Sequence, residues 1–233
     1  MIKTKTYKIE HTNKTNVYTL YIKGDHTYDL YKSISETKLL PTAFYNDGDD
    51  GDDSDTNSTS IIFTAETVTT LTKYLKKGKL TYNETIKMIN NVSRQIAYLE
   101  TNMLAFYGYN LDDILVINDE IFFIASTKHL LDIHKDNCIY FYNPIEQPYF
   151  SSFELNKLTK LPSKINHRVS YYSLGALVLF CVMNVYIFAE IQDISIAEET
   201  TETILKPITY TKIFWFLKRC FNEKCEDRIL LFI

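Results

Sequence analysis

The densest group of metal-ligating side chains in this sequence is an acidic run over residues 46–60, which reads NDGDDGDDSDTNSTS. Its aspartates alternate in the manner of a calcium loop, which places glycine at its sixth position and glutamate at its twelfth. Counted from Asp47, those two positions hold Asp52 and Ser58. Because the run also lacks a large apolar side chain to bury, it predicts a solvated, flexible loop rather than a metal site.

The histidines and cysteines also lack the spacing of metal ligands. His129 and His134 are five residues apart, so a helix would not stack them on one face. No cysteine belongs to a C-x-x-C pair, which favours reduced thiols over a zinc site or a disulfide framework. The four are Cys138, Cys181, Cys220 and Cys225. The sequence therefore predicts no metal site.

Composition limits the class of protein and the partners. The chain has 233 residues, 45% of them hydrophobic and 23% charged, which is typical of a folded soluble protein with one domain or two lobes. Its net charge of −4 excludes a large cationic surface, so we expect no nucleic-acid partner. The first residues, MIKTKTYKIEH, lack the apolar core of a signal peptide, which predicts a cytoplasmic location.

The first 60 residues predict a small, β-rich unit. Residues 6–10 and 17–22 are rich in β-branched and aromatic side chains, and the polar segment between them indicates a hairpin. Residues 29–40 carry apolar side chains along one helical side and stop before Pro41. The acidic run follows and ends this unit.

The next 65 residues predict strands around two helices. A short apolar strand at residues 60–64 precedes a helical turn that Gly78 can cap. Thr81 and Glu84 form a capping-box pattern, and apolar residues recur behind it at helical spacing to residue 103. Two apolar strands follow, joined by a two-residue turn. They are residues 114–117 and 120–124, with Asn118 and Asp119 between them.

One long apolar stretch lies in the last third of the chain. Residues 171–191 read YYSLGALVLFCVMNVYIFAEI, which indicates either a membrane span or a helix buried on all sides. Asn184 lies within the run and no basic cluster flanks one end, which favours the buried helix. A membrane anchor over residues 174–191 stays an alternative. Residues 209–221 predict a second core helix, in which Trp215 would pack, and residues 127–150 show no regular pattern.

The order of these elements resembles the large lobe of a protein kinase. A strand, a short helix ending in YLKKGKL, a long helix and the string NLDDILVI-ND-EIFFI follow one another as they do in that family. The NLDDI and YYSLG strings are similar to those of pseudokinases of giant DNA viruses. The resemblance implies an α+β fold, with a reduced β-rich N-terminal lobe at residues 1–60 and a mainly helical lobe at residues 61–233.

The same resemblance implies that the catalytic loop is degenerate. Phe106, Tyr107 and Gly108 stand where the family has His-Arg-Asp, and Asp113 stands where it has the magnesium-binding Asn. Residues 124–126, Ile-Ala-Ser, stand near the position of the family's Asp-Phe-Gly. Both carboxylates that kinase chemistry needs are therefore absent, and we expect no catalytic residue here.

Other parts of the family pattern are retained. Glu154 matches the Glu of the A-P-E segment, and residues 169–175 resemble the start of the central helix, with Ser170 in place of its Asp. Arg228 matches the arginine that pairs with that Glu. The resemblance implies a buried, bidentate ion pair between Glu154 and Arg228, with the charged groups closer than about 6 Å.

The small lobe matches the family least. It has no G-x-G-x-x-G loop to cover phosphates. Lys23, which ends an apolar strand, could replace the strand lysine of a kinase, with Glu36 as its partner on the helix. A lysine in this position is usually solvated.

The resemblance implies a kinase-fold pseudoenzyme that acts as a binding or scaffold protein, cytoplasmic in an infected cell or carried in a virion. Its protein partners are not indicated by the sequence, and no cofactor is expected. The alternatives are a divergent serine/threonine kinase or nucleotide-binding protein, using ATP and Mg²⁺ with Lys23 and Asp112 or Asp113 in altered roles, and a membrane-anchored protein.

Overall fold

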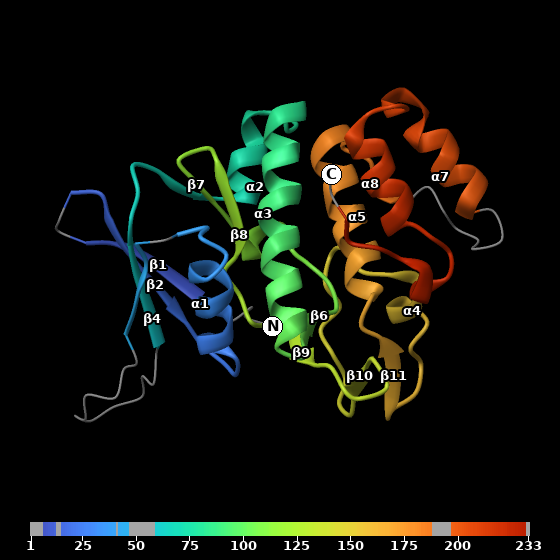
Figure 1. The fold of residues 1–233 in the computed structure, drawn as a ribbon, viewed down its shortest axis with the longest axis horizontal. Helices are drawn as coiled ribbons and strands as arrows, with labels where there is room; N and C mark the ends of the chain where they lie inside the picture. The colour runs from blue at the N-terminus through green and yellow to red at the C-terminus, as the bar shows by residue number, and fades with distance from the viewer. Residues whose placement is uncertain (1–6, 13–14, 41, 47–58, 188–196, 232–233) are drawn as a thin grey trace.

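A computed structural model of the chain describes residues 7–12, 15–40, 42–46, 59–187 and 197–231. The fold is mixed α+β, with small antiparallel sheets and helices (Figure 1). An N-terminal sheet lies at one end, the long helix α3 runs through the middle, and α5, α7 and α8 lie at the other end. Most of the acidic run, residues 47–58, is outside the described residues.

The N-terminal sheet has four antiparallel strands in the order β1-β2-β4-β3. They are β1 (Tyr7–His11), β2 (Val17–Ile22), β3 (Phe44–Asn46) and β4 (Thr59–Thr64). The expected hairpin forms between β1 and β2. The boundary expected at residue 60, however, falls within β4, because β4 pairs with β2 from Val17↔Thr64 to Ile22↔Thr59. The strand placed by sequence in the second unit therefore completes the first sheet.

Helix α1 (Thr27–Ser35) packs on α3 and on β4 of this sheet. It ends about five residues before the end expected at residue 40. Lys38 adopts a left-handed backbone conformation with φ of 59°, and the Leu39 amide bonds to the Ile34 carbonyl. A left-handed residue of this kind ends a helix through local hydrogen bonds, so the chain turns well before Pro41.

The middle of the chain follows the sequence pattern closely. Helix α3 (Tyr82–Thr101) begins at Thr81 with a complete capping box to Glu84. Strands β7 and β8 form the expected hairpin, and both turn residues, Asn118 and Asp119, have positive φ, as tight hairpin turns require. Strand β5 pairs with β7. The remaining bounds are β5 (Val68–Thr70), α2 (Leu71–Tyr74), η1 (Leu75–Lys77), β7 (Ile114–Ile117) and β8 (Ile121–Ile124).

Two further strand pairs lie where the sequence shows no regular pattern. Strand β6 (Leu104–Phe106) pairs with β9 (Leu130–Asp132), and β10 (Cys138–Phe141) pairs with β11 (Ser163–Asn166). Strands of three or four residues are too short for alternation to stand out. The segment 127–150, expected to be irregular, therefore contains two strands.

The long apolar stretch forms helix α5 (Val169–Met183), which packs against α3 and α8. Twelve of its fifteen residues are buried, on every side of the helix. It ends at Asn184, whose φ of 60° is left-handed, and is therefore shorter than the apolar run. A Cβ at Gly175 would lie 2.9 Å from Cys220 Cβ, so glycine permits the close approach of α8. Within the described residues, no helix combines the length and apolarity needed to cross a bilayer.

The C-terminal segment adds short helices around α5. They are α4 (Phe153–Asn156), α7 (Ala197–Leu205), η4 (Lys206–Ile208), α8 (Lys212–Cys220) and η5 (Cys225–Asp227). Helix α8 buries Ile213, Phe216 and Leu217, as its spacing predicts. Trp215, expected to pack in the core, is instead 49% exposed, because it lies on the opposite face of α8.

Candidate functional site

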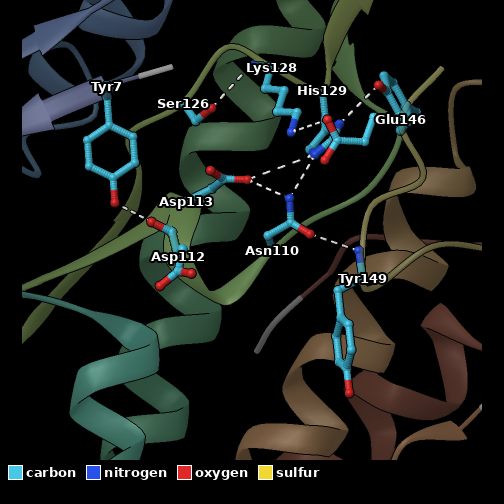
Figure 2. A network of polar contacts seen from close by, with 10 residues as sticks. Tyr7, Asn110, Asp112, Asp113, Ser126, Lys128, His129, Glu146 and Tyr149 are labelled. Carbon is cyan, nitrogen blue, oxygen red and sulfur yellow. Dashed lines mark hydrogen bonds and ion pairs between the residues drawn. The ribbon is translucent and has the colours of Figure 1, made fainter. Parts of the chain in front are cut away.

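The candidate site is the loop between β6 and β7, residues 107–113, together with the segments that cover it (Figure 2). Phe106 ends β6 and is buried, and the Tyr107 amide donates to the His129 carbonyl at 3.0 Å. Asp113 ends the short helix η2 (Leu111–Asp113), directly before β7. Strand pairing on both sides thus fixes the ends of the loop.

Gly108 lies beneath the segment that contains Pro148 and Phe150. A Cβ built on this residue would meet Pro148 Cγ at 2.1 Å and the Phe150 carbonyl oxygen at 2.8 Å. The backbones of Tyr109 and Phe150 exchange two hydrogen bonds, each of 2.9 Å, which hold the covering segment in place. Residue 108 therefore has no room for any side chain in this conformation.

Asp113 is the acidic side chain of this loop that turns inward. Asn110 Nδ2 donates to Asp113 Oδ2 at 2.9 Å, and the Asp113 carboxylate is 15% exposed. Burial raises the pKa of the Asp113 carboxyl, and the bond from Asn110 partly offsets this effect. Its backbone also takes part in the packing, because the Ala125 amide donates to the Asp113 carbonyl at 2.8 Å.

Asn110 joins Asp113 to a buried histidine. Asn110 Nδ2 lies 2.9 Å from His129 Nε2, His129 Nδ1 lies 2.9 Å from the Tyr107 hydroxyl, and the Tyr149 amide donates to Asn110 Oδ1. Burial lowers the pKa of His129 to about 4, so the ring is neutral at pH 7. Because the Asn110 amide is a donor, the tautomer that satisfies these contacts carries its proton on Nδ1.

Sequence reasoning missed Asn110 and His129 as members of this group. His129 was considered only as one of a histidine pair, and the structure places its ring against Tyr107 and Asn110 instead. The position of Asn110, before Leu111-Asp112-Asp113, is the signal that could have indicated it. Nothing local to His129 marks it as buried.

The end of β8 carries no carboxylate. A buried amide, Gln95 of α3, accepts from the Ile124 amide at 2.8 Å and donates to the Ile124 carbonyl at 3.0 Å. Gln95 Nε2 also donates to Ser33 Oγ at 3.1 Å. Helix α1, helix α3 and strand β8 are thus tied by one side chain, while Ala125 and Ser126 are buried beyond it.

Glu154 and Arg228 lie in contact, as the resemblance implies. Arg228 Nη2 lies 2.7 Å from Glu154 Oε1, and Arg228 is 2% exposed. The contact is not bidentate: Arg228 Nη1 and Glu154 Oε2 have no hydrogen-bond partner among the described residues. Arg228 Nε donates to the Asn222 carbonyl at 2.9 Å, and this bond orients the guanidinium so that only one nitrogen reaches the carboxylate.

Lys23 and Glu36 are not brought together. Glu36 lies at the C-terminal end of α1, where its carboxylate is 3.4 Å from Lys32 Nζ. In the part of the chain that the structure describes, no ion pair joins Lys23 to Glu36. Sequence spacing placed Glu36 within the helix, whereas α1 ends at Ser35 and leaves Glu36 at the surface.

Lys23 instead lines a cleft of about 830 Å³ between the N-terminal sheet and the strands β5 and β7. Lysines predominate among its charged lining residues: Lys8, Lys23 and Lys73 against Glu10. Tyr7 crosses from β1 to the candidate loop, where its hydroxyl donates to the Asp112 carbonyl (Figure 2). Tyr7 thus connects the cleft to the loop, and neither Asp112 nor Asp113 is among the residues that line the cleft.

The described ranges contain no cluster of three or more His, Cys, Asp or Glu side chains arranged to hold a metal ion. The candidate site thus consists of a filled loop and an adjacent cationic cleft. No protein-family model matches this chain, and no curated protein sequence matches it.

Proposed function

We propose that the chain has a protein kinase-like fold and acts as a binding or scaffold protein without phosphoryl transfer. Three features support the fold assignment. The strand and helix order of residues 61–124 follows the family pattern, α5 is buried among the C-terminal helices, and Glu154 contacts Arg228. The reduced N-terminal sheet with α1 corresponds to the small lobe.

Gly108 carries the functional part of the proposal. Phosphoryl transfer depends on a carboxylate that orients the attacking hydroxyl and on metal-held phosphates. Gly108 stands at the position of that carboxylate, and Pro148 and Phe150 occupy the space that any side chain there would need. The loop is therefore not a catalytic loop with one substitution but a packed part of the interior.

The neighbouring groups support the same conclusion. Asp113 is committed to Asn110, which is bonded in turn to His129 and Tyr149. The position expected to hold the second metal-binding acid is occupied by the buried Ala125 and Ser126. A kinase mechanism would need a carboxylate at residue 108, where this loop has none, and would have to free Asp113 from its bond to Asn110.

A phosphoryl-transfer assay tests the proposal directly. The purified chain, incubated with γ-labelled ATP, Mg²⁺ or Mn²⁺ and generic protein acceptors, should transfer no phosphate above a protein-free blank. An active kinase in the same mixture is the positive control. Transfer that is lost in Asp113→Asn, but retained in a matched change of an exposed acid such as Glu202→Gln, would overturn the proposal.

Nucleotide binding without turnover is a second candidate, favoured by one observation. Lys23 lines the 830 Å³ cleft and has no ion pair within the described residues. Mg²⁺–ATP at 100 times its Kd would raise the free energy of unfolding by about 2.7 kcal/mol. A saturable thermal shift that Lys23→Ala abolishes and Lys206→Ala leaves unchanged would establish it. The absence of any shift would exclude nucleotide binding and leave the binding or scaffold function as the remaining candidate.

A further inference from the structure

Strand β1 has an open edge. Within the described chain, β1 pairs only with β2, and the register runs from Tyr7↔Ile22 to His11↔Tyr18. The Thr12 amide donates to the Val17 carbonyl at 2.9 Å, which sets the alternation of the ladder. Antiparallel partners alternate between bonded and non-bonded pairs. It follows that Tyr7, Ile9 and His11 direct their backbone N–H and C=O groups away from β2.

The cleft surrounds this edge. Four consecutive residues of β1, from Tyr7 to Glu10, line it. Successive side chains of a strand point to opposite faces, so lining by all four fits a cleft that reaches the edge of the strand as well as the face that carries Lys8 and Tyr21. The opposite wall includes Val68, Thr69 and Thr70 of β5, an edge strand that pairs only with β7 among the described strands.

The charge around the edge is locally positive. Lys8, Lys23 and Lys73 line the cleft, and Glu10 is the one acid among the lining residues. Glu10 is already paired with Lys8. Neither Lys23 nor Lys73 has an ion-pair partner in the described part of the chain. Because the whole chain has a net charge of −4, this excess of lysine is a property of the cleft.

We propose that the cleft binds an extended, acidic segment of a partner protein, which adds a strand to the open edge of β1. The proposal rests on the assigned binding function and names the class of partner. Backbone hydrogen bonds to Tyr7, Ile9 and His11 supply the main-chain recognition, as in other cases of strand addition. Carboxylates on the added strand pair with Lys23 and Lys73, which sets the preference for acidic sequences.

Two observations favour a strand over a nucleotide as the occupant. The β1–β2 connection, His11 to Asn16, has no glycine that would let backbone amides approach a phosphate. The Asp113 carboxylate, which would have to hold a metal–phosphate group, is not among the groups that line the cleft, and the Tyr7 hydroxyl on that side is bonded to the Asp112 carbonyl. What remains open is the strand edge itself, with its row of alternating donors and acceptors.

Peptide titration tests the backbone part of the proposal. The probe is a fluorescein-labelled nine-residue peptide alternating threonine with aspartate, and the readout is fluorescence anisotropy. We expect saturable binding and slower hydrogen exchange at the Ile9 and His11 amides. Ile9→Pro removes an outward N–H without breaking a bond to β2, and proline is tolerated at such edges. It should weaken binding about tenfold, whereas Ile9→Val should leave binding unchanged.

If Ile9→Pro does not fold, the parent protein is titrated instead with peptides that are N-methylated at alternate residues. The methyl groups remove backbone N–H donors of the peptide. One of the two alternate methylation patterns should abolish binding and the other should not. Equal effects of both patterns would overturn the added-strand geometry.

A second set of variants tests the charge preference. The same peptide with lysine in place of aspartate should bind at least about tenfold more weakly. Lys23→Glu combined with Lys73→Glu should weaken binding of the acidic peptide by a similar factor, and Lys206→Glu, remote from the cleft, should not. Absence of binding, equal binding of both peptides, or complete displacement of the acidic peptide by Mg²⁺–ATP would overturn the proposal. Phosphate transfer would instead overturn the assigned function, so the two failures are distinguishable.

Discussion

The loop around Gly108 and the cleft beside β1 are neighbours that differ in how they are filled. The residual cavity lined by Gly108 and Asp113 is about 10 Å³, close to the smallest space that holds one water, while the cleft is about 830 Å³. Tyr7 and Asp112 form the contact between them. The loop side of this contact therefore has no space for a substrate, whereas the cleft side has space for a ligand.

The largest expected effect comes from placing a carboxylate in the filled loop. Gly108→Asp should lower the free energy of unfolding by more than about 3 kcal/mol, because its Cβ meets Pro148 and the Phe150 carbonyl and its charge would be buried. Urea denaturation measures this change. The variant should not gain phosphoryl transfer.

A matched pair of variants locates the cause of that loss. Gly108→Ala should be destabilised by about 2 kcal/mol, and adding Pro148→Gly should recover part of it, since the 2.1 Å contact goes and the contact with the Phe150 backbone stays. A Gly108→Asp protein as stable as the parent would show that the covering segment moves aside, and the contrast between loop and cleft would fail.

The ion pair lies four residues beyond Phe150 in the chain, so we expect it to help hold the segment that covers Gly108. Glu154→Ala should cost about 3 kcal/mol, because Arg228 stays buried without its carboxylate. Hydrogen exchange at the Phe150 amide should become faster in the same variant. Glu202→Ala, which removes an exposed pair with Lys218, should cost less than about 0.5 kcal/mol. A similar cost for both changes would contradict a structural role for Arg228.

Two groups with shifted pKa values should give opposing pH dependences. They are His129 of the candidate site and the half-buried Glu100 of α3, whose carboxylate accepts from the Tyr171 hydroxyl at 2.7 Å. Burial raises the pKa of the Glu100 carboxyl from 4.5 to about 7, so the folded state holds a proton that the unfolded state releases. Its contribution to stability therefore falls as the pH rises from 4.5 to 7. Burial lowers the pKa of His129 from 6.5 to about 4, so its contribution falls as the pH drops from 6.5 to 4.

Between pH 4.5 and 6.5 these two slopes oppose each other. In Glu100→Gln the opposing Glu100 effect is removed, so the free energy of unfolding should rise more steeply with pH across this range than in the parent. At pH 7.5 the variant should be about 2 kcal/mol more stable than the parent, allowing for the partial exposure of Glu100. Denaturation curves at several pH values measure both effects. A parent and variant with parallel pH profiles would contradict the burial of Glu100.

The smallest expected effect is at the contact between loop and cleft. Tyr7→Phe removes the hydroxyl that donates to the Asp112 carbonyl and should cost about 1 kcal/mol. Tyr18→Phe, on the neighbouring strand, is the control and should be near neutral. Thermal denaturation measures both. If Tyr7→Phe is also neutral, Tyr7 does not hold the sheet to the loop, and the inner end of the cleft is not closed by that bond.

Sequence reasoning was most accurate where the determining contacts are local. The capping box of Thr81 and Glu84 set the start of α3, and Asn118 and Asp119 set the turn between β7 and β8. The continuous apolar run, with Asn184 inside it and no basic cluster beside it, also favoured a buried helix for α5, although Asn184 ends the helix earlier than the apolar run does.

Sequence reasoning was least accurate for the candidate site. It placed Gly108 in the loop and, through the resemblance, expected no catalytic carboxylate there. Nothing local to Gly108 indicates that Pro148, forty residues away, fills the space. The role of His129 was missed for the same reason, because its partners Tyr107 and Asn110 are some twenty residues distant. The two short strands of segment 127–150 form only by pairing with β6 and β11.

The sequence alone determined the elements whose hydrogen bonds close within a few residues: the start of α3, the β7–β8 turn and the helical core of α5. Only the tertiary structure decided that β4 belongs to the first sheet, that the Gly108 loop is filled and that the cleft beside β1 is open. These outcomes depend on which distant surfaces meet, because packing contacts across many residues leave no periodic signal in the chain.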